Sequence, residues 1–111
     1  MMQRGEIYLV NLDPVVGSEV GKTRPALVLQ NEMANRTSPT VTVVPISSSV
    51  SRIYPFQVRL LASETGLDRD SKALCEQIRS IARQRLLHRL GQVSEGTLAN
   101  IRVALDRHLW F

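Results

Sequence analysis

The segment Thr40–Ile46, with the sequence TVTVVPI, is β-branched at almost every position and is the surest strand in the chain. Branching at Cβ restricts the χ1 rotamer and favours the pleated surface of a sheet over a helix. Pro45 has no amide hydrogen to donate to a neighbouring strand, so we expect an edge, a bulge or the end of the strand there. The fold of this chain is therefore built on a β-sheet.

Three further segments have strand length and are bounded by turn-forming residues: Glu6–Leu12, Ala26–Gln30 and Phe56–Leu61. In the first of these, Ile7, Leu9 and Val10 are the candidate core residues. The segment Ala73–Ile81 also predicts a strand, because its apolar residues match a helical face only weakly. A short closing strand is predicted at Gly91–Val93.

Between the strands, Asn31–Pro39 and Glu64–Ser71 are rich in turn formers, and Gln84–Arg89 predicts a single helical turn. The last segment predicts a helix, since Ser94 is a suitable N-cap and Glu95 suits a first turn. Apolar positions then recur at helical spacing, at Leu98, Ile101, Leu105 and His108 or Leu109. These elements predict a mainly β fold, a small, partly open barrel of about five to seven strands with a C-terminal helix.

The composition predicts one compact domain over residues 1–111, and 43% hydrophobic residues allow a core without disulfides or metals. The single cysteine, Cys75, excludes an intramolecular disulfide and is interpreted as a small buried hydrophobe. No apolar run approaches a membrane span, and the N-terminus lacks a signal-peptide pattern. We therefore expect a soluble cytoplasmic protein.

The formal net charge is +4, and among the fourteen basic residues only Lys22 and Lys72 are lysines. The planar fork of arginine grips phosphate through two hydrogen bonds and stacks on bases. The excess of arginine over lysine therefore favours a polyanion, such as nucleic acid, as the partner. A GC-rich genome also replaces lysine with arginine, so the bias by itself leaves both explanations open.

The stretch Gly17–Asn31, GSEVGKTRPALVLQN, joins a polar loop to an apolar strand, with Arg24 at the junction. Pro25 biases Arg24 toward an extended backbone and marks the start of the strand. Loops beside rigid strands often carry binding and catalytic residues. Arg24 is therefore a candidate functional residue, and the alternative is a surface ion pair with Glu19.

Three common kinds of site fit the sequence poorly. His88 and His108 are far apart and lack a companion at metal-ligand spacing, so no metal or other cofactor is predicted. The segment GSEVGKT differs from a nucleotide-binding loop, because its glycines are too close together and a strand follows instead of a helix. A serine–histidine–aspartate triad is weakly supported, because the hydroxyl cluster Ser47–Ser49 has no histidine in the β half of the chain.

What is left is an arginine and a hydroxyl cluster at two strand ends, with a glutamate in the loop. When a ribose 2′-hydroxyl attacks the adjacent phosphodiester, negative charge spreads over the phosphoryl oxygens, where an arginine such as Arg24 and a serine hydroxyl can donate hydrogen bonds. RNA brings its own nucleophile, so the reaction needs neither a metal ion nor a nucleophilic side chain. The alternative, in which Arg24 pairs with Glu19 and Ser47 caps a strand, stays open at this point.

Four ordered segments resemble the MazF/PemK family of bacterial toxin endoribonucleases over nearly the whole chain: Arg4–Glu19, Lys22–Asn31, Val41–Ser48 and Leu74–Leu86. The resemblance implies a small SH3-like barrel and a homodimer that cuts single-stranded messenger RNA in a sequence-specific, metal-independent way. The products would be a 2′,3′-cyclic phosphate and a 5′-hydroxyl. A cognate MazE-like antitoxin, with an acidic and partly disordered tail, would cover the RNA site.

By the same resemblance, the catalytic arginine of the family falls on Arg24 and its catalytic hydroxyl on Ser47. Threonine is commoner at the second position, and serine keeps the hydroxyl but loses the methyl group that restricts the rotamer. Glu19 matches the acidic residue of the first loop and is expected to orient Arg24 or to contact RNA. Further RNA contacts are expected in the first loop and beside the motifs, at Ser18, Lys22, Thr23, Asn31, Ser48, Tyr54, Gln77 and Arg79.

The other aromatic residues are interpreted mainly as packing residues. Phe56 is expected either in the core or near the RNA groove, and Trp110 and Phe111 in packing or in the dimer. Two rival functions also fit the sequence. A related SH3-like toxin fold binds and poisons DNA gyrase without catalysis, and an RNA-binding module would use Arg24 only to grip phosphate.

Overall fold

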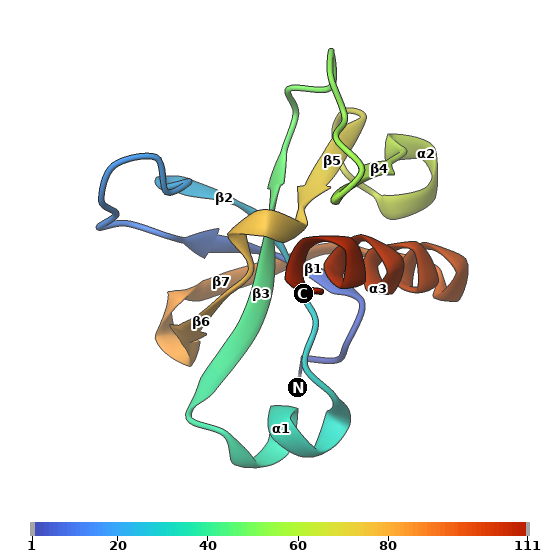
Figure 1. The fold of residues 1–111 in the computed structure, drawn as a ribbon. Helices are drawn as coiled ribbons and strands as arrows, with labels where there is room; N and C mark the ends of the chain where they lie inside the picture. The colour runs from blue at the N-terminus through green and yellow to red at the C-terminus, as the bar shows by residue number, and fades with distance from the viewer. Residues whose placement is uncertain (1, 111) are drawn as a thin grey trace.

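The structure, a computed structural model, describes residues 2–110, whose strands form an antiparallel sheet in the order β4-β5-β3-β2-β1-β7, with β6 paired to β3 (Figure 1). The strands are β1 (Glu6–Asn11), β2 (Thr23–Val28), β3 (Thr40–Ser47), β4 (Gln57–Leu60), β5 (Ser71–Leu74), β6 (Arg79–Ala82) and β7 (Leu86–Gln92). The helices are α1 (Glu32–Thr37), α2 (Ala62–Thr65) and α3 (Glu95–Leu109), with 3₁₀ turns η1 (Cys75–Gln77) and η2 (Arg83–Arg85). The predicted mainly β fold with a C-terminal helix is confirmed.

The strand β3 organises the sheet, because it pairs with three other strands. One edge pairs with β2, while the other edge pairs with β6 over residues 40–43 and with β5 over residues 46–47. Pro45 lies between these last two stretches and is buried. Its missing amide hydrogen therefore falls where β3 changes partner, two residues before the strand ends.

Two core clusters occupy opposite faces of the sheet, as the side-chain alternation of β3 requires. Val44 and Ile46 pack in the cluster that α3 covers with Ile101. Val41 and Val43 belong to the second cluster. Because Ile101 is fully buried, its truncation to alanine is expected to cost about 2–5 kcal/mol of folding free energy.

The strand β1 lies between both clusters, and one of its predicted core residues is only half buried. Ile7 and Val10 are fully buried in opposite clusters, as predicted, whereas Leu9 belongs to neither cluster. The register of β1 against β7 shifts between Leu9 and Val10, so the pairing is irregular at this end. The prediction for Leu9 is corrected accordingly.

The predicted loop Asn31–Pro39 is wrong over most of its length, because Glu32–Thr37 forms α1. The Oδ1 atom of Asn31 accepts a hydrogen bond from the Ala34 amide at 3.0 Å, which makes Asn31 the N-cap. At the other end, the guanidinium of Arg83 donates to the carbonyls of Ser38, Ala34 and Asn35. This long-range contact satisfies helix carbonyls and has no local signal in the sequence.

Three other segment predictions need correction. Ala73–Ile81 is two strands, since η1 interrupts it between β5 and β6. In the predicted helical turn Gln84–Arg89, only Gln84 and Arg85 are helical, as part of η2, and the rest belongs to β7. The predicted closing strand Gly91–Val93 is therefore the end of a longer strand, which runs from Leu86 to Gln92. In the predicted turn Glu64–Ser71, Glu64 and Thr65 close α2 and Ser71 opens β5.

The C-terminal helix agrees with its prediction. The Ser94 hydroxyl accepts a hydrogen bond from the Thr97 amide at 3.1 Å, and Ile101 is buried with Ala104. Trp110 is 84% exposed, so it does not pack within the chain, and Phe111 lies outside the described residues. None of the helices in residues 2–110 is long and apolar enough to cross a membrane.

Candidate functional site

A cleft of about 440 Å³ opens where the ends of β2 and β3 meet the loop that joins α2 to β5. Its lining comes from β2, from β3 and the residues after it, from that loop, and from β5 and β7: Arg24, Pro25, Ile46, Ser47, Ser48, Ser49, Gly66, Leu67, Asp68, Arg69, Ser71 and Leu90. Of the residues predicted to be functional, the cleft brings together Arg24, Ser47 and Ser48.

The register of β2 against β3 explains why Arg24 and Ser47 meet. The paired residues run from Val28 with Val43 to Ala26 with Pro45. Continued by two residues along both strands, the same register places Arg24 opposite Ser47. Both residues lie beyond the paired stretch and both line the cleft, so an arginine and a hydroxyl that are far apart in sequence share one wall.

Arg24 is half buried and oriented by the backbone of the first loop. Its Nε atom donates a hydrogen bond to the carbonyl oxygen of Gly21 at 2.9 Å. Within residues 2–110 the Nη atoms of Arg24 have no hydrogen-bond partner. One edge of the guanidinium is therefore fixed to the protein, while the terminal donors are available to a ligand in the cleft.

The base of the first loop is closed by hydrogen bonds around Gly21. The Oδ1 atom of Asp13 accepts from the Lys22 amide at 2.7 Å, and the Leu12 amide donates to the Lys22 carbonyl at 2.9 Å. A Cβ at Gly21 would lie 2.5 Å from Asp13 Oδ1 and 2.7 Å from a Val15 methyl carbon. Only glycine fits without a shift of these side chains, so the carbonyl that holds Arg24 depends on this residue.

Ser47 is half buried at the end of β3, and its Oγ atom accepts a hydrogen bond from the Ser49 amide at 3.1 Å. A hydroxyl that accepts one hydrogen bond can still donate its own proton. Ser48 is exposed and also lines the cleft. The end of β3 therefore presents a fixed hydroxyl followed by a more open one.

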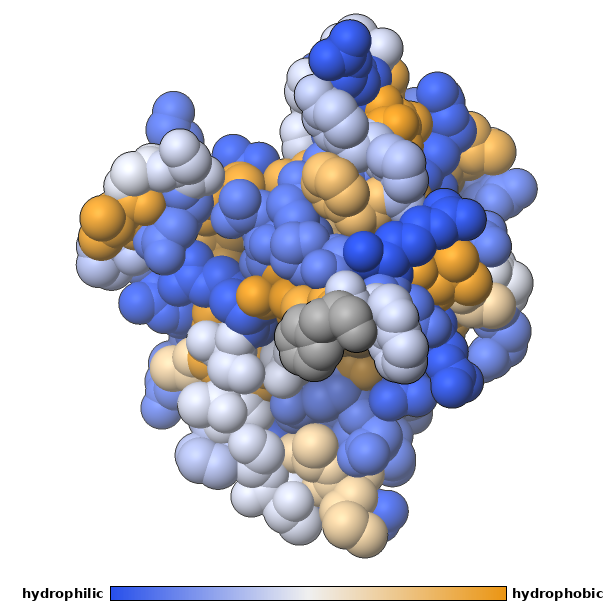
Figure 2. Space-filling model, in the orientation of Figure 1, coloured by the Kyte–Doolittle hydropathy of each residue, from blue (hydrophilic) through white to orange (hydrophobic). Residues whose placement is uncertain are grey.

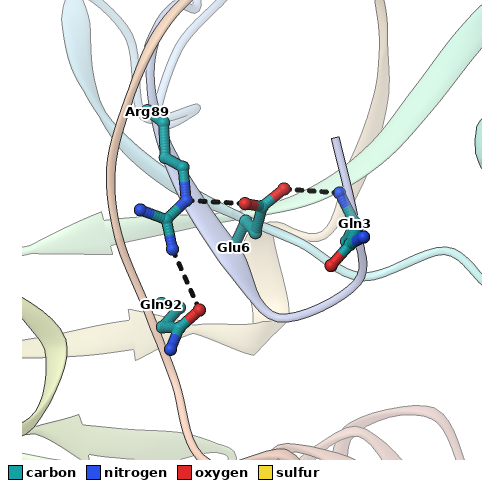
Figure 3. Close-up of polar contacts among 4 residues, drawn as sticks. All are labelled: Gln3, Glu6, Arg89 and Gln92. Carbon is teal, nitrogen blue, oxygen red and sulfur yellow. Dashed lines mark hydrogen bonds and ion pairs between the residues drawn. The ribbon is translucent and has the colours of Figure 1, made fainter. Parts of the chain in front are cut away.

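Glu19 lies outside the lining of the cleft, on the exposed first loop. Its Oε1 atom accepts a hydrogen bond from the Val16 amide at 2.7 Å. The ion pair that the structure contains in residues 2–110 joins Arg89 and Glu6, at 2.6 Å, on another part of the molecule (Figure 3). The alternative surface pair of Arg24 with Glu19 is therefore not formed.

The tip of the first loop is polar with an apolar end. Val16 is 81% exposed, and Figure 2 shows orange surface on the projection at the left of the molecule, among polar residues.

Two residues predicted to contact RNA form hydrogen bonds with the backbone at the two ends of this loop. Gln77 Oε1 accepts from the Val20 amide at 3.2 Å, and Arg79 Nη1 donates to the Leu12 carbonyl at 3.4 Å.

The remaining predicted RNA contacts do not line the cleft. Asn31 caps α1, and Tyr54 stacks on Phe56 with ring centroids 5.5 Å apart. Phe56 is half buried and outside both core clusters. Three residues are exposed on the first loop and at the start of β2: Ser18, Lys22 and Thr23. Their roles in RNA binding stay predictions.

The far wall of the cleft, from Gly66 to Arg69, was not predicted as part of a site. Gly66 ends α2 with a φ of 86°, a left-handed conformation that glycine adopts without strain. A Cβ on Gly91 of β7 would overlap the Thr65 carbonyl, so glycine lets β7 approach α2 closely. The charges of Asp68 and Arg69 were the available signal, but a charged turn is usually only solvated surface.

The cleft contains neither a thiol nor an obvious metal site. No cluster of three His, Cys, Asp or Glu side chains suited to a metal ion occurs in residues 2–110. Cys75 is buried in the core, as predicted, and burial together with the nearby charge of Glu76 raises its pKa to about 12. Such a thiol stays protonated at neutral pH and is a poor nucleophile.

A small antiparallel sheet with an arginine and a serine in one cleft is the arrangement that the sequence resemblance implied, that of a toxin endoribonuclease. The family described as PemK-like, MazF-like toxin of type II toxin-antitoxin system matches residues 3–109, and the chain belongs to this family.

Relatives of known structure or curated function agree with this membership. The chain is 51% identical to endoribonuclease MazF9 of Mycobacterium tuberculosis, over 98% of this chain and 97% of that protein. MazF (Form-I) from Deinococcus radiodurans has a TM-score of 0.85 and 29% identity, covering 99% of this chain and 97% of its own. A MazE-MazF structure (Form-II) from the same organism has a TM-score of 0.77 and 27% identity, covering 99% and 96%.

Proposed function

We propose that this chain is a toxin endoribonuclease that cleaves single-stranded messenger RNA at specific sequences without a metal ion. The observation that carries the proposal is the shared row of Arg24 and Ser47 in one cleft, in a member of the MazF-like family. The strand break arises from attack of a ribose 2′-hydroxyl on the adjacent phosphodiester. The products are a 2′,3′-cyclic phosphate and a 5′-hydroxyl.

Arg24 stabilises the transition state of this reaction. Its Nε is already bonded to the Gly21 carbonyl, so the guanidinium does not need to reorganise as charge develops on the phosphoryl oxygens. The Nη donors then point to those oxygens, a kind of contact that lowers the barrier by about 3–4 kcal/mol. A charged donor of this type also assists the proton transfers around the phosphate.

Ser47 donates a hydrogen bond from its hydroxyl to the same phosphate, and Ser48 extends the contact along the strand end. Glu19 acts on the first loop, as a supporting residue that shapes it or contacts RNA. The predicted contacts on this loop, at Ser18, Lys22 and Thr23, together with Asn31, Tyr54, Gln77 and Arg79, extend the RNA path beyond the cleft. Arg69 adds a cation on the far wall.

The regulation that fits this function is neutralisation by an antitoxin. The Deinococcus radiodurans relative is described as a MazE-MazF structure, which supports a MazE-like partner for this chain. An acidic, disordered tail of that partner would compete with RNA for the basic cleft. We further propose a cytoplasmic homodimer of single-domain chains.

Incubation of the purified chain with an end-labelled single-stranded RNA tests the proposal. We expect discrete cuts that persist in EDTA and leave ends that carry a cyclic phosphate and a free 5′-hydroxyl. RNA binding without any cleavage, weakened steeply by salt, would instead support the binding module. Inhibition of DNA gyrase supercoiling with intact RNA would support the gyrase poison.

A further inference from the structure

Lys72 in β5 is a buried lysine beside the candidate site, and nothing described so far explains it. Its side chain is 8% exposed, and it is the cation among the five buried polar residues found in the described chain. Burying a cation is unfavourable unless it is paired with a charge or hydrogen-bonded. Within residues 2–110 no carboxylate lies at ion-pairing distance from Lys72.

The register places Lys72 in the same row as the site residues. Ser47 is the cross-strand partner of Lys72 between β3 and β5, and Arg59 is its partner between β5 and β4. Ser47 thus has Lys72 as its partner on one side, and on the other side the end of β2 with Arg24 lines the same cleft. Lys72 itself does not line the cleft, so its effect on a ligand must pass through other residues.

The polar contact of Lys72 is with the loop that follows Ser47. Its Nζ atom donates a hydrogen bond to the carbonyl oxygen of Arg52 at 2.7 Å. Ser47 holds the same loop three residues earlier, through its Oγ and the Ser49 amide at 3.1 Å. The segment Ser48–Arg52 therefore rests on two neighbouring side chains of the sheet.

This segment is a wall of the cleft, because Ser48 and Ser49 line it. Beyond Arg52, the next attachments of the loop are at Tyr54, whose amide and carbonyl bond to Gln57. If Lys72 did not hold Arg52, the backbone between Ser49 and Tyr54 would lose its anchor to the sheet, and only the exposed contact of Arg52 Nη1 with the Tyr54 hydroxyl at 3.2 Å would remain. The wall would then sample positions away from the cleft.

We propose that Lys72 is a positioning residue that holds the Ser48–Arg52 segment in the conformation that binds RNA. The inference rests on the proposed function, because it assigns the segment to RNA binding. Lys72 acts on the affinity for RNA and not on the chemical step, because Arg24 and Ser47 are held in place by the pairing of their strands and not by this loop. Loss of the bond lowers the population of the binding-competent loop, and apparent affinity falls by the same fraction.

The test compares two substitutions that each remove one positive charge from the same row. Lys72→Met keeps the approximate length of the side chain without a donor, and Arg59→Met is the control, because the Arg59 side chain is exposed and makes no hydrogen bond within residues 2–110. For Lys72→Met we expect the KM for RNA to rise about tenfold with kcat within about twofold, as for loss of a charged hydrogen bond. Arg59→Met should leave both within about twofold.

Hydrogen exchange of the free protein measures the tether without RNA. In Lys72→Met the amides of Ser49–Ile53 should exchange at least about tenfold faster, while those of Val41–Val44 in β3 keep their rates. If Lys72→Met does not fold, Lys72→Gln serves instead, because its shorter side chain cannot reach Arg52.

Each result decides a different statement. An unchanged KM in Lys72→Met, or an equal rise in Arg59→Met, overturns the positioning role. Unchanged exchange of the loop overturns the tether itself. Absence of RNA cleavage by the unaltered chain overturns the proposed function and with it the RNA role of the loop, whereas the exchange rates still decide whether Lys72 holds the loop.

Discussion

The two walls of the cleft are held in different ways. One wall is formed by the paired strands β2 and β3, and Arg24 and Ser47 lie on it, each two residues beyond the last pair, Ala26 with Pro45. The other parts are loops, such as the segment after β3 that begins with Ser48 and Ser49 and is held at its far end by a single hydrogen bond from Lys72 to the Arg52 carbonyl. A paired strand cannot shift one side chain without breaking its ladder, whereas a loop can move when one bond is lost. We therefore expect the strand wall to set the rate of the chemical step and the loops to set affinity.

The largest effect is expected on the strand wall, at Arg24. Arg24→Ala should lower kcat by about 10²–10³, since it removes donors that act on the developing charge. Its one hydrogen bond is to a loop carbonyl, so the melting temperature should change little. Kinetics with a fluorogenic RNA and a thermal melt measure both quantities.

Arg24→Lys makes the prediction sharper, because it keeps the charge and loses the planar fork and the Nε contact to Gly21. We expect it to recover only a small part of the rate. A folded Arg24→Ala protein with unchanged kcat would show that the strand wall does not carry the chemistry.

The second effect on the strand wall is expected at Ser47. Ser47→Ala should lower kcat by about tenfold to a hundredfold, because the phosphate loses one neutral donor and the Ser49 amide loses its acceptor. Ser47→Thr keeps the hydroxyl and should stay within about threefold of the unaltered rate. Ser48→Ala, on the exposed neighbour, is the matched control. An equal loss of kcat in that variant would show that the role does not belong to Ser47 alone.

The same contrast explains how much of the molecule the sequence could predict. Thr40–Ile46 and the apolar part of β2 were predictable because β-branching and turn residues act locally, and so was α3 with its Ser94 cap. The meeting of Arg24 with Ser47 depends on register, which no local pattern encodes, and it entered only through a family resemblance. The helix α1 was missed because the Arg83 side chain satisfies its carbonyls from 45 or more residues away.

The far wall was missed for a related reason. Whether Leu67, Asp68 and Arg69 face a cleft or the solvent depends on how close β7 comes to α2. That distance is set by the absence of a side chain at Gly91, a contact between residues far apart in sequence. Local charge patterns cannot separate these two outcomes.

A third prediction concerns the link between the loop and the strand wall. Gly21→Ala introduces a Cβ 2.5 Å from Asp13 Oδ1, so the Asp13 side chain that accepts from the Lys22 amide must shift, and we expect the neighbouring carbonyl that holds Arg24 Nε to move with it. We expect kcat/KM to fall about tenfold, because a small displacement of a catalytic group has a large effect on rate. The control is Gly96→Ala in α3, where the nearest atom to a Cβ is 3.8 Å away.

Gly96→Ala should leave activity unchanged and slightly raise the melting temperature, since alanine is the better helix former. If Gly21→Ala keeps full activity in a stable protein, Arg24 does not depend on the loop, and the two walls are independent.

The smallest effect is expected at Glu19, which is exposed and bonded within its own loop. Glu19→Gln keeps an oxygen acceptor for the Val16 amide and loses only the charge, so kcat should change by about twofold. Glu19→Ala removes the acceptor as well, so the loop loosens and KM rises more than kcat falls. A general base behaves differently, because its removal lowers kcat by about 10²–10⁴ and abolishes the acidic limb of the pH–rate profile. The pH dependence of kcat for Glu19→Gln therefore separates the two roles. An unchanged profile assigns Glu19 to the loop, whereas a lost limb would give the first loop a part in the chemical step and remove the division of roles between strands and loops.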